Sequence, residues 1–228
     1  MRAMILAAGL GTRMRPLTLT RPKPLLKAGG KALIEYHIER LARIGVERIV
    51  INHAWLGEQI EAELGDGERF GVPLLYSAET EPLETAGGIR QALPMLADDE
   101  HECFLVVNGD VYTELSDDAL SALSLSPEQQ AHLLLVDNPP WHPTGDFHLQ
   151  GGHVAAEGCP RLTFAGISLL RASLFSALIP GQPAALAPLL REAMAIDAVC
   201  GTQIEDFWDD IGTPERLTAL DQRLRGEC

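Results

Sequence analysis

Hydrophobic residues in the first half of the chain form alternating strand-like and helix-like segments. Residues 3–8 are an uninterrupted apolar run that ends at Gly9, which is typical of a strand buried on both faces of a parallel sheet. Apolar residues between Ile34 and Ala42 recur at the spacing of a helix that faces a core. Further strands are predicted at 47–52, 74–76 and 103–108, and further helices at 55–64 and 85–96. This alternation predicts an α/β fold with a Rossmann-like, doubly wound, mixed and mostly parallel sheet that carries helices on both faces.

The second half of the chain has a less regular pattern. Its predicted elements are a helix over 116–125, a strand over 131–136, short strand-like pieces within 138–158, a strand over 161–170, a helix over 185–194 and a last helix that begins after Thr213. No repeat, low-complexity tract or clear linker separates the halves, so we expect one domain over 1–228. Right-handed crossovers would bring the strand ends near residues 8, 76 and 108 to one edge of the sheet, where open α/β sheets bind ligands.

Length and composition restrict the class of protein further. With 228 residues, of which 46% are hydrophobic, the chain can bury a core without disulfides or structural metals. The four cysteines, at 103, 159, 200 and 228, are widely separated, which predicts reduced thiols and a cytoplasmic protein. The apolar run near the N-terminus is too short to span a membrane and lacks a cleavage pattern, so neither a signal peptide nor a transmembrane helix is expected.

The charge of the chain is distributed unevenly. A net charge of −14 argues against nucleic acid and against an anionic membrane as general partners. Residues 1–34 nevertheless contain seven of the eighteen basic residues, including every lysine, and no Asp or Glu. This concentration of cations in a Gly-rich segment predicts a bound small anion of high charge, and the alternative is a solvated basic loop.

The segment from Leu6 to Leu25 contains the residue types that bind phosphate. Gly9 and Gly11 can adopt backbone angles that expose successive N–H groups to phosphate oxygens. Arg13 adds a guanidinium beside them, and Lys23 lies between two prolines that we expect to keep its backbone extended. The Gly-Lys-Ser/Thr of a Walker A loop and the third glycine and acidic residue of a dinucleotide fingerprint are both missing, which argues against a hydride-transfer enzyme.

These motifs resemble those of the sugar-1-phosphate nucleotidyltransferase family. The Gly9-Leu-Gly11 loop with Arg13 and the later Pro-Lys-Pro around Lys23 are its hallmark, and the similarity continues at Asn108-Gly-Asp110 and at Trp208-Asp-Asp-Ile-Gly-Thr213. The resemblance implies that Asp110 and Asp210 bind Mg²⁺, for which two carboxylates with phosphates and water are chemically sufficient. The alternative is that Asp110 caps a turn and Asp210 caps a helix.

The resemblance also implies which residues bind the nucleotide. They are Leu6, Ala8, Gly9, Gly11, Thr12, Arg13, Glu79, Glu84, Thr85 and Asn108. Glu79 holds the base-reading position, where a carboxylate can accept the N3–H of uracil or thymine, or the two edge donors of guanine. The residue type alone does not select among these bases, and a solvated acidic turn is the alternative. Many family members have Gly in place of Glu84.

Within the family, residues 51–57, 81–88 and 145–147 are most similar to those of the N-acetylmuramate 1-phosphate uridylyltransferases of bacterial cell-wall recycling. This similarity implies UTP and N-acetyl-α-muramic acid 1-phosphate as substrates. It assigns the sugar phosphate to Lys23, Gly145, Asp146, Thr163 and Gly166. Residues 1–112 would then be a nucleotide-binding half, and residues 113–228 a sugar-phosphate-binding half with the C-terminal helix.

The implied reaction is the transfer of UMP to a sugar 1-phosphate with release of pyrophosphate. A phosphate monoester is largely a dianion at neutral pH and can attack without a protein base. Arg13 and Lys23 would be the catalytic residues, with Arg13 on the leaving pyrophosphate and Lys23 on charge between donor and acceptor. His53, Trp55 and Trp141 are interpreted as packing residues, and the protein as a monomer or small homo-oligomer. Alternatives are a mannose-1-phosphate guanylyltransferase, a glucose-1-phosphate thymidylyltransferase and a non-catalytic nucleotide-sugar sensor.

Overall fold

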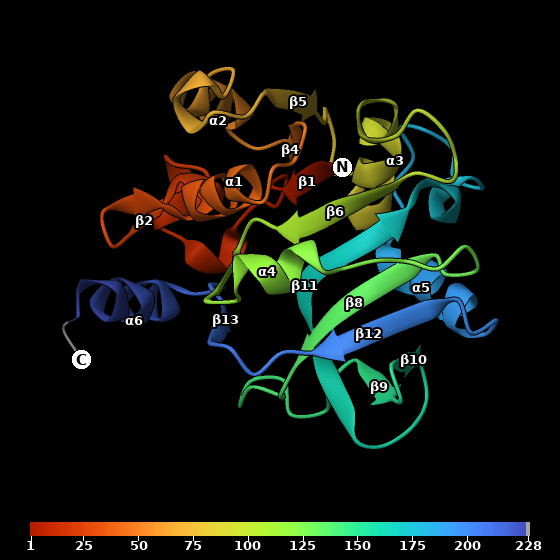
Figure 1. Cartoon of the computed structure of the whole chain (residues 1–228). Coiled ribbons are helices and arrows are strands. Elements are labelled where there is room, and N and C mark those ends of the chain that lie inside the picture. The colour runs from red at the N-terminus through yellow and green to blue at the C-terminus, as the bar shows by residue number, and fades with distance from the viewer. Residues whose placement is uncertain (227–228) are drawn as a thin grey trace.

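A mixed nine-stranded sheet runs through the whole molecule (Figure 1). The computed structural model describes residues 1–226. The strands of the sheet are β1 (Arg2–Leu6), β4 (Ile49–His53), β5 (Leu74–Ala78), β6 (Cys103–Asn108), β8 (Ala131–Val136), β9 (Phe147–Gln150), β10 (His153–Ala155), β11 (Arg161–Arg171) and β12 (Val199–Gln203). They are arranged in the order β5-β4-β1-β6-β11-β8-β12-β10-β9.

The first four strands of this order are parallel, as the apolar runs predict. β1 lies between β4 and β6, and β4 also pairs with β5. β11 then runs antiparallel to both β6 and β8, and β12 pairs with β8 in parallel. Two short ribbons complete the strands, one made of β2 (Lys27–Ala28) and β3 (Lys31–Ala32), and one made of β7 (Val111–Thr113) and β13 (Trp208–Asp210). The predicted α/β class with a mixed, doubly wound sheet is thus confirmed, but the sheet is not mostly parallel, because four of its pairings are parallel and five are antiparallel.

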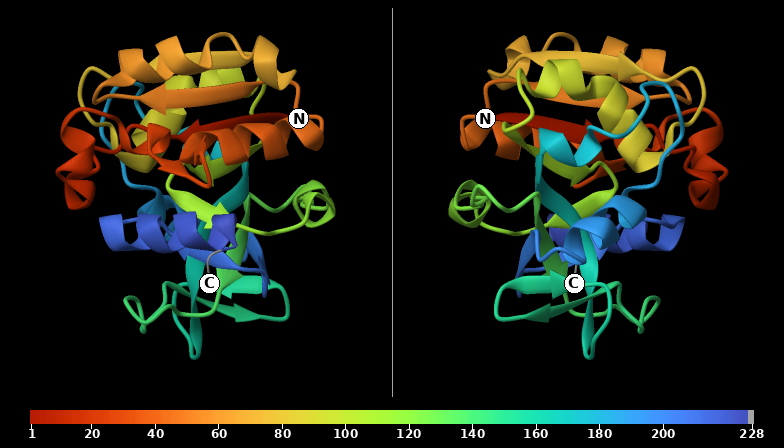
Figure 2. Two further views of the ribbon diagram at one scale, coloured as in Figure 1. Left: turned by 90° about the vertical axis from the view of Figure 1, so that its left-hand side faces the viewer. Right: turned by 90° about the vertical axis from the view of Figure 1, so that its right-hand side faces the viewer.

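Helices cover both faces of the sheet (Figure 2). The helices are α1 (Leu33–Arg43), α2 (Gly57–Leu64), α3 (Glu84–Leu96), α4 (Asp117–Ser121), α5 (Leu186–Met194) and α6 (Pro214–Arg225). Side chains of α1, α2 and α4 pack in one hydrophobic core with alternate residues of β1, and those of α3 and α5 pack in a second core with the others. A third, smaller core joins α6 to the segment after β1 through Met14, Leu26 and Ile211. The C-terminal helix is therefore fixed beside the Gly-rich loop.

Several elements differ from the sequence prediction, which did not include the short strands β2, β3, β7 and β13. α4 ends at Ser121 rather than at 125, because Leu123 and Leu125 both pack on the core at a spacing of two residues, which a helix does not allow. β12 carried no clear strand signal because Gly201 interrupts it. A Cβ at Gly201 would lie 2.6 Å from Val154 Cγ2 on β10, so this glycine allows the two strands to approach.

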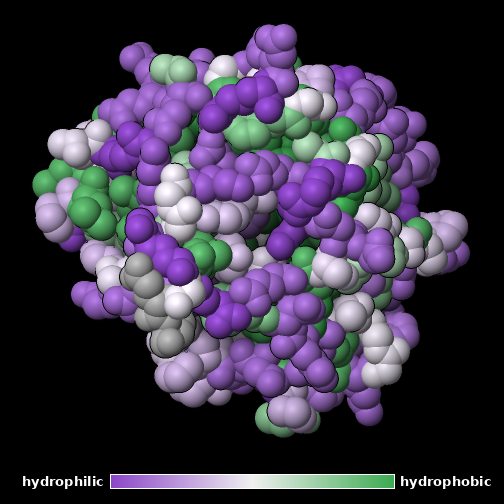
Figure 3. Space-filling model, turned by 60° about the vertical axis from the view of Figure 1, so that its left-hand side comes forward, coloured by the Kyte–Doolittle hydropathy of each residue, from purple (hydrophilic) through white to green (hydrophobic). Residues whose placement is uncertain are grey.

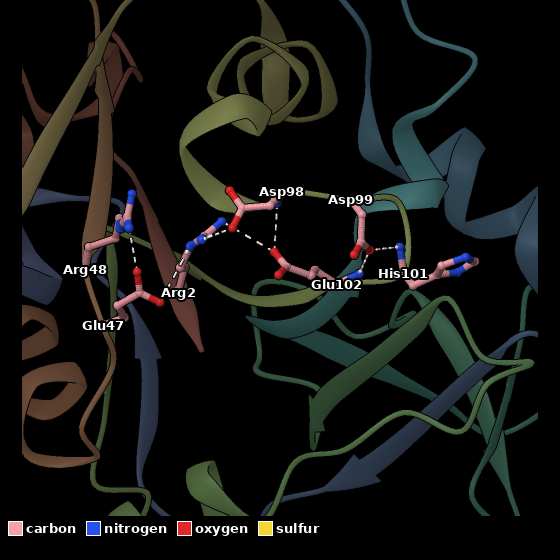
Figure 4. A network of polar contacts seen from close by, with 7 residues as sticks. All are labelled: Arg2, Glu47, Arg48, Asp98, Asp99, His101 and Glu102. Atoms are coloured by element: carbon pink, nitrogen blue, oxygen red, sulfur yellow. Dashed lines mark hydrogen bonds and ion pairs between the residues drawn. The ribbon is translucent and has the colours of Figure 1, made fainter.

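An ion-pair network holds the amino edge of the sheet (Figure 4). Arg2, at the start of β1, contacts Glu47 before β4 and both Asp98 and Glu102 before β6. The Glu102 carboxylate also accepts the backbone N–H of Asp98 at 2.8 Å. These contacts fix the loops at one edge of the parallel strands and leave the opposite, carboxyl edge to the site described below.

Three of the four cysteines lie within the described part of the chain. Cys103, Cys159 and Cys200 are free thiols, whereas Cys228 lies outside the described residues. Over residues 1–226, the structure contains no helix with both the length and the apolar character needed to cross a bilayer.

Candidate active site

A cleft made of three adjoining hollows lies at the carboxyl ends of the parallel strands. The strand-end hollow, of about 310 Å³, is lined by residues 6–10, Lys23, Pro24, Asn52, Glu79, Pro82, Glu84, Thr85 and residues 108–110. The loop hollow is lined by residues 9–14, Lys23, Asp110 and Gly212. The C-terminal hollow is lined by Arg13, Asn108, Asp110, Val111, Trp141, His142, Thr163, Phe164, Gly166, Trp208 and Asp210. Asp110 borders all three hollows. Figure 3, a side view of the molecule, shows a predominantly hydrophilic surface with a depression near its centre.

The Gly-rich loop continues directly from β1 and bends at Gly11. Gly11 has a φ of 60°, and its carbonyl accepts hydrogen bonds from the Thr18 hydroxyl at 2.7 Å and from the Met14 N–H at 2.9 Å. These bonds close the loop over the buried Met14 side chain. Arg13 extends from the bend and has no ion-pair partner within residues 1–226. A guanidinium without a carboxylate partner, in a protein of net charge −14, is suited to bind an anion.

Lys23 is buried in the cleft and paired with a carboxylate. Its side chain is 10% exposed, and its Nζ lies 2.7 Å from Asp110 Oδ2. The expected extended backbone at Lys23 is wrong, because residues 23–25 form a short 3₁₀ turn in which the Leu25 N–H donates to the Pro22 carbonyl at 2.9 Å. This turn buries Leu25 completely and directs the ammonium group at the end of β6.

Glu79 lies at the inner end of the strand-end hollow and is 6% exposed. Its Oε1 accepts from Asn52 Nδ2 at 2.6 Å, and its Oε2 accepts from the Leu83 N–H at 3.0 Å. Asn52 in turn accepts the N–H of Ala7 at 2.9 Å through Oδ1. This chain of bonds links β1, β4 and the segment after β5, and it holds a carboxylate that still has acceptor capacity facing the hollow.

Glu84 begins α3 with a φ of 57°. This left-handed backbone conformation favours glycine, and it costs a residue with a side chain about 1–2 kcal/mol. The backbone around Glu84 and Thr85 lines the strand-end hollow. Glu84 thus adopts a backbone conformation for which glycine is the favoured residue.

The two aspartates expected to bind metal are brought together by the β7–β13 ribbon. Asp110 immediately precedes β7, and Asp210 ends β13, where it pairs with Val111. The Ile211 N–H donates to the Asp110 carbonyl at 2.8 Å. Residues 100 positions apart in the sequence are therefore fixed on neighbouring strands, and both side chains line the C-terminal hollow.

The carboxylates fit a hard divalent cation. Asp210 Oδ1 is buried and has no hydrogen-bond partner among the described residues, so it can accept a cation. Within the same part of the chain, no group of three or more His, Cys, Asp or Glu side chains is arranged to hold a metal, so substrate and water oxygens would complete the coordination. Asp209 differs from Asp210, because it does not line the hollow and burial raises its pKa to about 6.

Trp141 lines the C-terminal hollow, and Arg216 lies beside it without lining the hollow. Arg216, near the start of α6, lies 3.8 Å from Asp209 and 3.5 Å from Asp210. Its guanidinium carbon is 4.3 Å from the centre of the Trp141 ring, a cation–π geometry. Trp141 is 50% exposed and lines the C-terminal hollow, and its predicted role as a loop anchor stays a prediction.

The predicted site residues fall into two groups. Those that line the cleft are Leu6, Ala8, Gly9, Gly11, Thr12, Arg13, Lys23, Glu79, Glu84, Thr85, Asn108, Asp110, Thr163, Gly166 and Asp210. Gly145 and Asp146 are not among the lining residues. Asp146 instead accepts the Phe164 N–H at 2.8 Å through Oδ2 and lies 3.1 Å from His142 Nε2 through Oδ1.

Sequence reasoning missed Asn52 and His142 as lining residues and Arg216 as a neighbour of Asp210. Asn52 is the last residue of a predicted strand that ends at the ligand-binding edge of the sheet. This position could have been used to predict Asn52 as a lining residue. His142 and Arg216 reach the site only through packing of distant segments, and the sequence carries no local signal for that. The packing interpretation agrees with the structure for His53, which is buried with Nε2 2.6 Å from Glu61, whereas Trp55 is exposed and donates to the Thr18 carbonyl at 3.1 Å.

Comparison with known proteins gives relatives over the whole chain. The family model described as nucleotidyl transferase matches residues 2–147. The N-acetylmuramate alpha-1-phosphate uridylyltransferase of Neisseria meningitidis serogroup B is 50% identical over 95% of this chain and 95% of its own length. The protein of the same name from Caulobacter vibrioides is 34% identical over 97% of this chain and 96% of its own.

The fold also matches a solved structure. A crystal structure from Bacillus anthracis, described as a glucose-1-phosphate thymidylyltransferase in complex with sucrose, superposes with a TM-score of 0.83 over 99% of this chain and 96% of that one. Its sequence identity is 20%, so the likeness concerns the fold alone.

Proposed function

The chain belongs to the nucleotidyl transferase family, and from this we infer that it transfers UMP from UTP to N-acetyl-α-muramic acid 1-phosphate. The products are UDP-N-acetylmuramate and pyrophosphate. The family implies a nucleoside triphosphate and a sugar 1-phosphate as substrates, and the relative at 50% identity supports uridine and muramate as the particular pair.

One structural observation supports this function above all others. The side chains of Arg13, Lys23, Asp110 and Asp210 face one continuous cleft, although they come from four separate segments. Two cations and two carboxylates around a common space are what a reaction between a triphosphate and a phosphate monoester needs, because alignment and charge compensation are the main catalytic effects in phosphoryl chemistry.

Each of these groups has a distinct role in the proposed reaction. The acceptor phosphate, largely a dianion, attacks the α-phosphorus directly, so no protein base is required. Lys23 neutralises charge between donor and acceptor, and Arg13 holds the leaving pyrophosphate. Asp110 and Asp210 would hold Mg²⁺, which when bound supplies positive charge to the phosphates.

Glu79 provides the contact that reads the base. Its two oxygens already accept bonds from Asn52 and Leu83, which fixes the carboxylate in place. A fixed acceptor at the inner end of the hollow suits the single N3–H of uracil. Thymine has the same donor and guanine has two, so the choice of UTP rests on the relatives rather than on this carboxylate alone.

A pyrophosphate-release assay tests the proposal directly. UTP, GTP, dTTP and ATP are each combined with the 1-phosphates of N-acetylmuramic acid, N-acetylglucosamine, mannose and glucose. We expect the highest kcat/KM for UTP with the muramate acceptor. Highest turnover with GTP and mannose 1-phosphate, or with dTTP and glucose 1-phosphate, would replace the assignment by the corresponding transferase, and nucleotide binding without any pyrophosphate release would identify a sensor.

The Asp110→Asn variant tests whether Asp110 binds Mg²⁺ in the cleft. The substitution removes one negative charge and keeps the size of the side chain. We expect Mg²⁺-dependent pyrophosphate release to be lost while the far-ultraviolet circular dichroism and the unfolding midpoint of the folded protein remain close to wild type. Near-normal turnover of this variant would contradict the role of Asp110.

The cytoplasmic location and a monomeric or small oligomeric state stay predictions.

A further inference from the structure

His142 lines the C-terminal hollow, and the proposed reaction gives it no role. We propose that His142 selects the acceptor, by pairing with the carboxylate of its 3-O-lactyl group. This inference rests on the proposed function, because it concerns the chemical feature that separates muramic acid from N-acetylglucosamine.

The charges around the hollow support this assignment. The muramate acceptor carries two anionic groups, the phosphate and the lactyl carboxylate. Of the residues that line the C-terminal hollow, Asp110 and Asp210 would repel a carboxylate. Arg13 also borders the loop hollow, and the proposed reaction assigns it to the leaving pyrophosphate. His142 is the remaining lining side chain that can carry positive charge.

The structure holds the His142 ring in a defined orientation. Its Nε2 lies 3.1 Å from Asp146 Oδ1, and Asp146 is itself anchored because its Oδ2 accepts the Phe164 N–H at 2.8 Å. The other ring nitrogen, Nδ1, makes no hydrogen bond to any residue in the range 1–226. When both ring nitrogens carry a proton, one N–H donates to Asp146 and the second is available for a ligand carboxylate. Asp146 is then a positioning residue and not a direct sugar ligand.

Trp141 adds an apolar surface next to this donor. The Arg216 guanidinium stacks on one face of the ring, and Arg216 itself forms ion pairs with Asp209 and Asp210. These contacts hold the Trp141 ring in place. Half of the Trp141 side chain remains exposed beside the hollow. A lactyl ether presents a methyl group next to its carboxylate, and an indole ring next to a cationic donor matches both parts of that substituent.

The test compares two acceptors that differ only in the lactyl ether. Steady-state kcat/KM is measured with UTP and either N-acetylmuramic acid 1-phosphate or N-acetylglucosamine 1-phosphate, and the Kd of each acceptor is measured by calorimetry. We expect His142→Gln to lower kcat/KM for the muramate acceptor by about 10- to 100-fold, the effect of losing one charge-assisted hydrogen bond. The value for N-acetylglucosamine 1-phosphate should change less than about twofold, which also shows that the variant is folded.

Two further variants separate charge from position. His142→Lys keeps a cation and is expected to retain more of the muramate preference than His142→Gln. Asp146→Asn is expected to reduce the preference, because the imidazole loses the carboxylate that orients it. His153→Gln changes an exposed histidine on β10 that does not line the hollow, and it should leave both acceptors unchanged.

The outcomes distinguish the two levels of inference. An unchanged acceptor preference in His142→Gln, or an equal loss with both acceptors, would overturn the role of His142 and leave the transferase assignment intact. A wild-type enzyme that shows no preference for the muramate acceptor would instead overturn the proposed substrate, and the inference about His142 with it.

Discussion

Gly9 and Gly11 lie two residues apart in the loop after β1, but glycine is needed at the two positions for different reasons. A Cβ at Gly11 would lie 2.9 Å from Thr18 Cγ2, and its φ of 60° is strained for other residues. A Cβ at Gly9 would have no heavy atom within 4 Å, and Gly9 is not among the residues with positive φ. The fold requires glycine at 11, whereas the open space at 9 is available to a ligand.

This difference predicts opposite results for two alanine variants. Gly9→Ala should leave the unfolding midpoint within about 1 °C of wild type, since the fold has room for the methyl group, but raise KM for UTP by about tenfold or more because the methyl group occupies ligand space. Gly11→Ala should lower the free energy of unfolding by about 1–2 kcal/mol. Thermal unfolding and UTP kinetics measure both, and an unchanged KM in Gly9→Ala would exclude Gly9 from the nucleotide site.

Lys23 should act on the transition state more than on nucleotide binding. Its ammonium donates to Asp110 Oδ2 at 2.7 Å, so the fold itself fixes its position in the cleft. For Lys23→Ala we expect kcat to fall by about 10²- to 10³-fold, with a much smaller increase in the Kd of UTP. Equal losses in kcat and in affinity would reassign Lys23 to substrate binding.

Among the elements, α1 helps to hold the strand that carries Asp110. His37 on α1 is buried, and its Nε2 lies 2.8 Å from the carbonyl oxygen of Val111, the residue after Asp110. Burial lowers the pKa of His37 from 6.5 to about 4, with the charge of Arg40 acting in the same direction. The neutral imidazole therefore links α1 to β7 at physiological pH.

The pKa shift of His37 makes the stability depend on pH. The unfolded chain takes up a proton below pH 6.5 and the folded chain only near pH 4, so stability falls as the pH decreases through this window. Between pH 7.5 and pH 5, wild type should lose about 2 kcal/mol through His37. His37→Gln should be less stable at pH 7.5 but lose correspondingly less on acidification. Urea unfolding at both pH values measures this, and equal losses in the two proteins would contradict it.

Across the whole molecule, the two edges of the parallel strands have different functions. The Arg2 network joins the loops at the amino edge, whereas at the carboxyl edge Lys23 pairs with Asp110 in the cleft. The cleft is formed by the Gly-rich loop, β6, the β7–β13 ribbon and the loop that carries Trp141. A ligand that contacts these segments should stabilise the fold as a unit.

Ligand binding should therefore raise the unfolding temperature. At UTP concentrations about 100 times the Kd, with Mg²⁺, linkage predicts about 3 kcal/mol of added stability, or an increase of about 5 to 10 °C. ATP at the same concentration should give a smaller increase because it lacks the N3–H donor that Glu79 accepts. In Asp110→Asn, the part of the increase that requires Mg²⁺ should disappear. Differential scanning fluorimetry measures these shifts, and equal increases with UTP and ATP would contradict base reading by Glu79.

The sequence by itself determined the alternating elements, the class of the fold and the Gly-rich loop. Each of these depends on short-range patterns: apolar runs for buried strands, helical spacing for α1 and α3, and glycines that allow a bend after β1. Residue type also indicated Arg13 and Lys23, because few side chains can compensate the charge of phosphates. The family resemblance then implied Asp110 and Asp210 as ligands of Mg²⁺.

Only the tertiary structure decided which of these groups share a cleft and what surrounds them. The Asn52–Glu79 bond, the pairing of Asp210 with Val111 and the stacking of Arg216 on Trp141 join segments that are far apart in the chain. Such contacts depend on strand order and on helix packing, and no local pattern encodes them. For that reason the sequence identified the charged residues of the cleft, whereas only the packing of the folded chain placed His142 in the same hollow.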